Sequence, residues 1–172
     1  FNYELSDCHD KFFKDIHNLF YPDDNMSSRC MAKGLYYELY LNDVHCGYAV
    51  ALNGADAIKK YSHIFNDVER ILFDEFQSEN NKYCTDEIKK LLSVHTSVSR
   101  GRGKQIRYVP VYMCGNTVSL LNPYYTALGI SDRLKQDTNF LRGDGFVVEQ
   151  GYIKSAGDAM MESGFNRAFS SN

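Results

Sequence analysis

Hydrophobic and polar positions alternate along the chain in blocks that predict both helices and strands. Between residues 7 and 20, apolar side chains recur at helical spacing, and Pro22 then lies in a turn-forming stretch that ends the helix. Residues 35–41 and 44–52 are apolar and aromatic runs separated by Asn42-Asp43. This arrangement predicts a β-hairpin.

Two further apolar runs predict strands in the core of a sheet. Residues 70–73 and 108–114 are short and continuous in their hydrophobicity, which is typical of strands buried on both faces. Between them lies an amphipathic helix, for which we expect Thr85 to be the N-cap. The other expected elements are a helix at 54–61, a helix beginning at Asn122-Pro123, a strand at 146–149 and a helix at 156–169.

Strands that alternate with helices predict an α/β fold with a central, mainly parallel sheet flanked by helices. No repeat, low-complexity tract or linker interrupts the chain, so its 172 residues are expected to form one domain. A domain of this length can bury about 70% of its unfolded surface. We therefore expect a core that needs no disulfide or metal to hold it.

Composition and charge exclude several classes of protein. Hydrophobic residues make up 44% of the chain and charged residues 24%, which excludes intrinsic disorder. The net charge of −3 excludes a binder that holds nucleic acid by bulk positive charge. No apolar run approaches the ~20 residues of a membrane-spanning helix. The five cysteines and five histidines lack metal-ligand spacing, so we expect free thiols and surface or helix-face histidines.

An acidic pair directly follows the first predicted core strand. Asp74 and Glu75 come after three apolar residues, in the pattern of a Walker B segment. The first carboxylate could orient Mg²⁺ through coordinated water, and the second could polarise a water aimed at a γ-phosphate. The same pair could instead simply end the strand and cap a loop.

Two more polar features accompany the acidic pair. Asn116 ends the second predicted core strand, and the carboxyl ends of parallel strands are where ligands bind in α/β sheets. Asn116 could therefore contact a γ-phosphate, or it could be an ordinary turn residue. The loop at 99–104 is basic and interrupted by glycine. It could be a solvated loop, an arginine finger or a contact to nucleic-acid phosphates.

A P-loop is absent from these residues, because no G-x-x-x-x-G-K-[ST] motif occurs in them. The stretch from Gly101 to Lys104 comes near to it, but Val98 occupies the place of the first glycine and Gln105 follows the lysine. Without a P-loop there is no cradle of backbone N–H groups for the β-phosphate. We do not expect this stretch by itself to bind ATP well.

Several of these motifs follow one another at the intervals of a known family. They are Ile71-Leu72-Phe73-Asp74-Glu75-Phe76, the helix through Leu91-Leu92, Ser99-Arg100-Gly101-Arg102, Gly115-Asn116-Thr117-Val118-Ser119 and Asn122-Pro123-Tyr124. The series resembles the DNA-packaging motor ATPases of small, protein-primed tailed bacteriophages, which are RecA-like, additional-strand P-loop ATPases. The resemblance is clear from about residue 12 to residue 124, and it is weaker from 142 to 169, where the family has its lid region.

The resemblance implies the ATPase core of a viral genome-packaging motor. Such a motor uses ATP and Mg²⁺ to move double-stranded DNA into a prohead through a homo-oligomeric ring, here expected to be a pentamer, at the portal vertex in the host cytoplasm. It also implies a P-loop segment ahead of Phe1, core elements in residues 1–140 and a lid-like part in 141–172. The family's basic residue after the Asp-Glu-Phe element is replaced by Gln77-Ser78. The implied roles are Asp74 for Mg²⁺, Glu75 for catalysis, Asn116 as sensor, Arg100 as a finger acting on the next subunit, and Arg102 as its substitute.

Two other functions remain open from the residues alone. One is a non-hydrolysing RecA-like structural or nucleic-acid-binding module, whose phosphate contacts would come from Lys104, Arg107 and the basic loop before them. The other is a metal-dependent nuclease, because two-metal sites need several convergent carboxylates. Its candidate ligands are Asp74, Glu75 and either Asp144 or Glu149.

Overall fold

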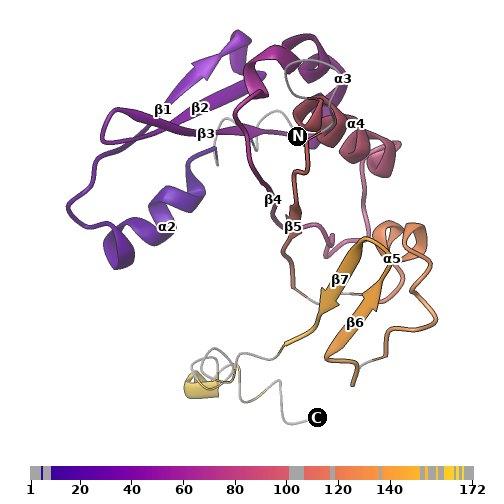
Figure 1. Cartoon of the computed structure of the whole chain (residues 1–172). Helices are drawn as coiled ribbons and strands as arrows, with labels where there is room; N and C mark the ends of the chain where they lie inside the picture. The colour runs from indigo at the N-terminus through magenta and orange to yellow at the C-terminus, as the bar shows by residue number, and fades with distance from the viewer. Residues whose placement is uncertain are drawn as a thin grey trace. The chain divides into compact units, whose positions relative to one another are not determined.

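The computed structural model (Figure 1) describes Leu5, residues 9–100, 107–116, 119–135 and 137–151, and scattered positions from 154 to 168. The chain divides into two compact units, Phe1–Val118 and Ser119–Asn172. Helices and strands occur together, so the predicted mixed α/β character is confirmed. Within the described residues, no helix has both the length and the apolar character needed to span a membrane.

The first unit begins with a helix and a three-stranded antiparallel sheet. Helix α2 (Lys11–Phe20) is the predicted first helix. The sheet has the order β1 (Met26–Met31), β2 (Tyr36–Leu41), β3 (Val44–Val50). The predicted hairpin is β2–β3, and both turn residues have positive φ, 50° at Asn42 and 62° at Asp43. Paired positive φ values are the geometry of the tight hairpin turns that match strand twist.

Strand β1 was not predicted, because its Met-Ser-Ser-Arg-Cys-Met sequence lacks the β-branched and alternating apolar residues typical of strands. It forms along the outer edge of β2, with every residue from Met26 to Met31 in register. The Arg29 guanidinium lies 4.4 Å from the centre of the Tyr40 ring. Pairing with a neighbouring strand, rather than local propensity, therefore accounts for this element.

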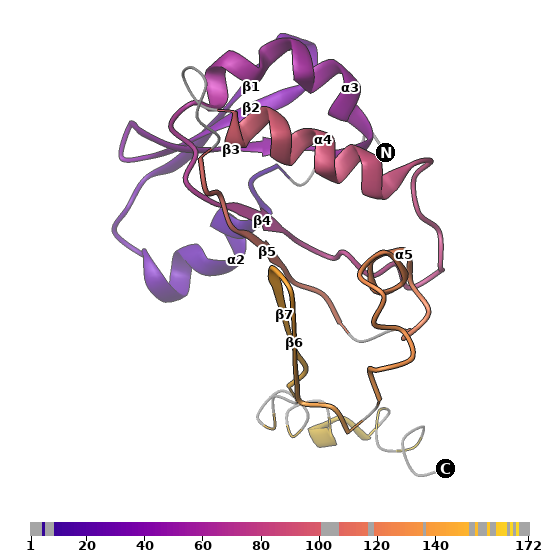
Figure 2. The ribbon, with the colours of Figure 1, turned by 45° about the vertical axis from the view of Figure 1, so that its right-hand side comes forward.

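Short helices connect the antiparallel sheet to the next strand. They are η2 (Leu52–Gly54), α3 (Ala55–Ile58) and η3 (Lys59–Phe65), and they confirm and extend the helix predicted at 54–61. The longer α4 (Glu87–Ser99) packs against them and runs beside α3 (Figure 2). These helices cover the sheet and close the core of the first unit.

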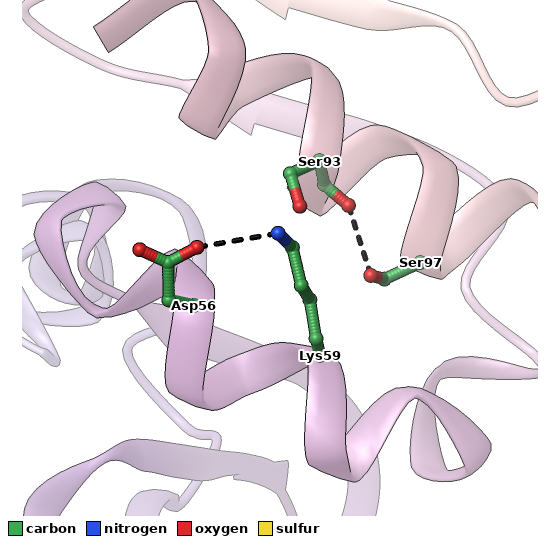
Figure 3. A network of polar contacts seen from close by, with 4 residues as sticks. All are labelled: Asp56, Lys59, Ser93 and Ser97. Atoms are coloured by element: carbon green, nitrogen blue, oxygen red, sulfur yellow. Dashed lines mark hydrogen bonds and ion pairs between the residues drawn. The ribbon is translucent and has the colours of Figure 1, made fainter. Parts of the chain in front are cut away.

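A polar contact marks the surface where α3 and α4 meet (Figure 3). The Lys59 ammonium lies 3.2 Å from a carboxylate oxygen of Asp56 and points toward Ser93 on α4. Ser97, which is buried, donates a hydrogen bond of 2.8 Å from its hydroxyl to the Ser93 carbonyl. The Asp56–Lys59 pair is exposed, whereas the hydrogen bond of Ser97 lowers the cost of burying its hydroxyl.

The core of the first unit lies between the hairpin, the short helices and α4. Ile58 and Ala55 have no exposed surface, and the Tyr36 ring packs against the ring of Phe65 with centroids 6.4 Å apart. Full burial of a side chain of this size contributes about 1.5–3 kcal/mol. The buried cluster comprises Tyr36, Ala55, Ile58, Phe65, Val94, Val98 and Val109.

A parallel pair of strands completes the first unit and lies below this core in Figure 1. Strands β4 (Ile71–Phe73) and β5 (Val111–Met113) are parallel, as predicted. The prediction that both are buried on both faces is wrong, since Leu72 and Tyr112 lie opposite each other and are 53% and 54% exposed. Among the described strands, β4 and β5 pair only with each other, so alternate side chains point away from the core.

A central, mainly parallel sheet is not formed by the described residues. Their strands form one antiparallel sheet of three strands, the parallel pair β4–β5 and one antiparallel hairpin. That hairpin belongs to the second unit. The strand predicted at 146–149 is confirmed as β7 (Phe146–Glu149), which pairs with the unpredicted β6 (Phe140–Gly143).

The second unit also contains the predicted helix after Asn122. Helix α5 (Pro123–Ala127) has proline at its first position, and the side chain of Asn122 accepts a hydrogen bond of 2.9 Å from the Tyr125 N–H. The helix start was predicted from this proline, and the Asn122 cap is an additional contact that the structure shows. The helix predicted at 156–169 lies largely outside the described residues.

Candidate active site at the ends of β4 and β5

An open cleft of about 1390 Å³ lies in the first unit, between β3, the ends of β4 and β5, and the segment from 74 to 87. Asp74, Glu75 and Asn116 all line it, although they come from strands far apart in the sequence. Its volume exceeds the roughly 300–1,000 Å³ typical of small-molecule pockets. Its described charged side chains are mainly acidic: Asp67, Glu69, Asp74, Glu75, Glu79 and Glu87, against Arg70 and Lys82.

The acidic pair lies in a bulge of the backbone at the end of β4. The Cys114 N–H donates to the Phe73 carbonyl at 2.9 Å, and the Cys114 carbonyl accepts from the Phe76 N–H at 3.2 Å. In a regular parallel ladder, the two residues bonded to one partner are two positions apart. Here they are three apart, so one extra residue is inserted between them. Bulges of this kind turn side chains in new directions and occur often beside active sites.

Glu75 has the left-handed backbone conformation, with φ of 52°. For a residue with a Cβ atom this conformation costs roughly 1–2 kcal/mol. The Glu75 side chain is exposed, whereas that of Asp74 is half-buried. The bulge thus holds two neighbouring carboxylates in different surroundings, one of them partly shielded from solvent and the other open to it.

The residues after the bulge are buried. Phe76 is 9% exposed and Gln77 is 6% exposed. The Phe76 ring packs directly over Gly115, where an added Cβ would lie 3.2 Å from the ring carbon Cδ1. This contact joins the residue that follows Glu75 to the residue that precedes Asn116.

The next part of the cleft wall is held by its own hydrogen bonds. The Lys82 N–H donates to the Ser78 hydroxyl at 3.0 Å, and the Cys84 N–H donates to the Glu87 carboxylate at 2.8 Å. The predicted N-cap at Thr85 is wrong, because Asp86, in a left-handed conformation, precedes the helix. Burial, and then the Glu87 carboxylate, raise the pKa of the Cys84 thiol. At neutral pH this thiol is protonated and is therefore a poor nucleophile.

The predicted basic residues lie away from the acidic pair or outside the described residues. Arg100 is exposed at the end of α4 and is not among the cleft residues. Arg102 and Lys104 lie outside the described residues. The Arg107 guanidinium donates to the Val98 carbonyl at 3.0 Å and to the Phe65 carbonyl at 3.3 Å. It therefore ties the end of α4 to the end of η3.

Comparison with known proteins identifies the family of this chain. The sequence profile of the family described as Podovirus DNA encapsidation protein (Gp16) matches residues 2–149. The chain belongs to this family. The predicted resemblance to phage packaging-motor ATPases is thereby confirmed, and the chain is a phage DNA-encapsidation protein.

Solved structures of phage packaging proteins share the fold of this Gp16-family chain. The crystal structure of the N-terminal domain of the DNA packaging ATPase from bacteriophage phi29 aligns with a TM-score of 0.63 and 23% identity, over 86% of this chain and 69% of that one. A chain of the bacteriophage Phi-29 genome packaging motor assembly aligns with a TM-score of 0.52 and 25% identity, over 85% of this chain and 40% of that one.

A third similar structure is the Phi-28 gp11 DNA packaging motor, with a TM-score of 0.53, 17% identity, and coverage of 92% of this chain and 47% of that one. The Gp16-family chain therefore spans less than half the length of the two motor chains. No curated protein matches it.

Part of the cleft wall is aromatic and was not predicted for this Gp16-family chain. His45 on β3 packs against Tyr48, with ring centroids 4.6 Å apart, and against Tyr40 at 5.6 Å. The Tyr48 hydroxyl donates to the Ile64 carbonyl at 2.9 Å. The sequence places these residues on a strand, but only the packing of η3 against the hairpin brings them to the cleft.

Metal binding at this site would need ligands besides protein side chains. Among the described residues, no three His, Cys, Asp or Glu side chains lie close enough to hold a metal ion together. Asp74 suits Mg²⁺ in this setting, because Mg²⁺ is commonly held by one or two carboxylates, several waters and substrate phosphates. The nuclease alternative needs a larger carboxylate cluster, and the described part of the chain provides none.

Proposed function

We propose that these residues form part of the ATP-hydrolysing core of a DNA-packaging motor. Mg-ATP would bind at the cleft, and its hydrolysis would drive double-stranded DNA into the prohead. The observation that supports this most is that Asp74, Glu75 and Asn116 line one cleft at the carboxyl ends of a parallel strand pair. This edge is where ligands bind in open α/β sheets.

The proposed chemistry divides the work between these three side chains. The half-buried Asp74 would orient Mg²⁺ through its coordinated water, and Mg²⁺ would neutralise phosphate charge in a cleft that is otherwise acidic. Glu75, open to solvent, would accept a hydrogen bond from the attacking water and direct it at the γ-phosphate. Asn116 would donate from its amide to the γ-phosphate.

The remainder of the nucleotide site would come from other parts of the protein. A P-loop, which these 172 residues do not contain, would bind the β-phosphate and complete a RecA-like sheet around β4 and β5. Residues 141–172 would form a lid-like part.

We place Arg100 in the site of a neighbouring subunit. Its side chain is exposed and lies outside the cleft of its own chain, as a residue acting on another subunit must. Arginine fingers contribute about 10³–10⁵ to the rate of hydrolysis. This arrangement requires a homo-oligomeric ring, which we propose to be a pentamer at the prohead portal in the host cytoplasm. Arg102 would be its substitute, and Lys104 would contact the DNA backbone.

The substitution Glu75→Gln in the full-length protein tests this proposal. It keeps the size of the side chain but removes its ability to accept a proton, so we expect ATP hydrolysis to fall by about 10²- to 10⁴-fold. Nucleotide binding, measured with a fluorescent ATP analogue, should persist. Asp56→Asn is the control, because Asp56 is exposed on α3 and pairs with Lys59. Unchanged turnover of Glu75→Gln would contradict the proposal.

A further inference from the structure

The contact between Phe76 and Gly115 links the two proposed catalytic segments. Phe76 directly follows Glu75, and Gly115 directly precedes Asn116. An ideal Cβ at Gly115 would lie 3.2 Å and 3.4 Å from two carbons of the Phe76 ring and 3.5 Å from the Gln77 backbone nitrogen. The φ of Gly115 is not positive, so the backbone conformation does not require glycine here. An added methyl group at Gly115 would instead make the Phe76 ring yield by a few tenths of an ångström.

The bulge that carries Glu75 is held at its two ends by one residue. The Cys114 backbone makes a hydrogen bond to Phe73 before the bulge and another to Phe76 after it. Glu75 itself is exposed and in a left-handed conformation that costs free energy, so neighbouring contacts must maintain that conformation. The buried ring of Phe76, seated on Gly115 directly after Glu75, is one such contact.

We propose that Phe76 and Gly115 act as a positioning pair that couples the placement of Glu75 to that of Asn116. This inference rests on the proposed function of the cleft. A displacement of the Asn116 segment moves Gly115, and the Phe76 ring, which contacts Gly115, would shift with it. The bulge then changes the position of the Glu75 carboxylate. Contact of Asn116 with a γ-phosphate would in this way set the geometry of the water-directing glutamate.

The substitution Gly115→Ala tests the pair by filling the space under the ring. We expect kcat for ATP hydrolysis by the full-length protein to fall about tenfold, because the ring must yield by a few tenths of an ångström and a 1 Å misplacement can cost about 10²-fold. The dissociation constant of the nucleotide should stay within about twofold, since the group displaced acts in the reaction rather than in binding. The control is Gly54→Ala, outside the cleft, where an added Cβ makes an ordinary contact of 3.4 Å with a Leu35 methyl carbon and φ is −82°.

Two double variants separate positioning from general packing. In a Glu75→Gln background, Gly115→Ala should cause no further loss of turnover, because the pair acts through Glu75. The variant Phe76→Leu/Gly115→Ala, with a smaller side chain over the new methyl group, should recover at least about threefold in kcat over Gly115→Ala alone. If the contact served only to stabilise the fold, Gly115→Ala would lower the melting temperature. It would leave kcat and the dissociation constant of the nucleotide unchanged.

The outcomes distinguish this inference from the function on which it rests. If Glu75→Gln hydrolyses ATP normally, the proposed function fails. If Glu75→Gln is inactive while Gly115→Ala turns over like Gly54→Ala, the positioning pair is wrong. A further loss of turnover in the Glu75→Gln background also contradicts the pair. Should Gly115→Ala not fold, Phe76→Leu alone must show the same loss of kcat at unchanged nucleotide affinity.

Discussion

The Arg107 guanidinium donates a hydrogen bond of 3.0 Å to the backbone carbonyl of Val98, in the last turn of α4. A second bond from the same nitrogen reaches the Phe65 carbonyl, and the Arg107 N–H donates to the Ser99 carbonyl at 2.8 Å. An arginine expected to contact DNA therefore joins three segments of the fold. Because Arg107 and Ser99 flank the basic loop, these bonds also bring its two ends together.

Replacement of Arg107 should lower stability more than it changes DNA binding. Arg107→Met removes the guanidinium donor from the Val98 carbonyl and one of the two donors to the Phe65 carbonyl, which also accepts from the Val68 N–H, so we expect the free energy of unfolding to fall by about 1–3 kcal/mol in urea titrations. Arg107→Lys should recover little of this, because an ammonium cannot reproduce the planar guanidinium fork. The control Arg70→Met removes a surface arginine that is 72% exposed and should change stability by about 0.5 kcal/mol or less.

Duplex DNA binding by the same Arg107→Met variant tests the alternative role. A direct phosphate contact would reduce the slope of log affinity against log salt by about one. We expect the slope to match that of the native protein. A change of one in the slope, with stability unaffected, would assign Arg107 to the DNA surface instead.

The left-handed conformation of Glu75 predicts an unusual order of stability among its variants. Glycine adopts positive φ without a steric cost, whereas alanine retains the Cβ clash. Glu75→Gly should therefore be more stable than Glu75→Ala by about 1 kcal/mol in chemical denaturation. At Asp74, whose φ is not positive, the order should be reversed. The same order at both positions would show that the bulge is not formed as described.

Alkaline pH should destabilise the first unit through the half-buried Tyr48. Burial, and then the Asp67 carboxylate, raise the pKa of Tyr48. The phenol then keeps its proton in the folded state at a pH where the unfolded chain releases it, near 10. Its contribution to stability is full below that pH and is lost as the pH rises through the folded-state pKa. Urea titrations from about pH 8 to 11 should show this decline, and Tyr48→Phe should make it shallower.

The cap of α5 predicts a separable effect in the second unit. Asn122 is 3% exposed, and its side-chain oxygen accepts from the Tyr125 N–H. Asn122→Ala should lower the free energy of unfolding by about 1 kcal/mol, the usual cost of a lost N-cap. Asn122→Ser keeps a side-chain oxygen that can accept from the Tyr125 N–H, so its cost should be smaller. Equal costs for both variants would argue that the cap contributes little.

Features set by neighbours in the sequence were predictable from the sequence alone. The hairpin turn at Asn42-Asp43, the start of α5 at Asn122 and the acidic pair at the end of β4 all depend on residues within a few positions of one another. Propensity, turn chemistry and capping act over that range. The motif series that resembled the packaging ATPases was predictable for the same reason, since each motif is a short run of residues.

Features set by residues distant in the sequence appeared only in the tertiary structure. Strand β1 forms because β2 offers an edge for pairing. Leu72 is exposed because β4 pairs only with β5 among the described strands. Arg107 is held by backbone carbonyls that lie 9 and 42 positions away in the sequence. The bulge at Glu75 likewise depends on Cys114, on another strand. Local patterns encode which residues favour a strand or a turn. The packing of the whole chain decides which partner completes each hydrogen bond and which element covers each face.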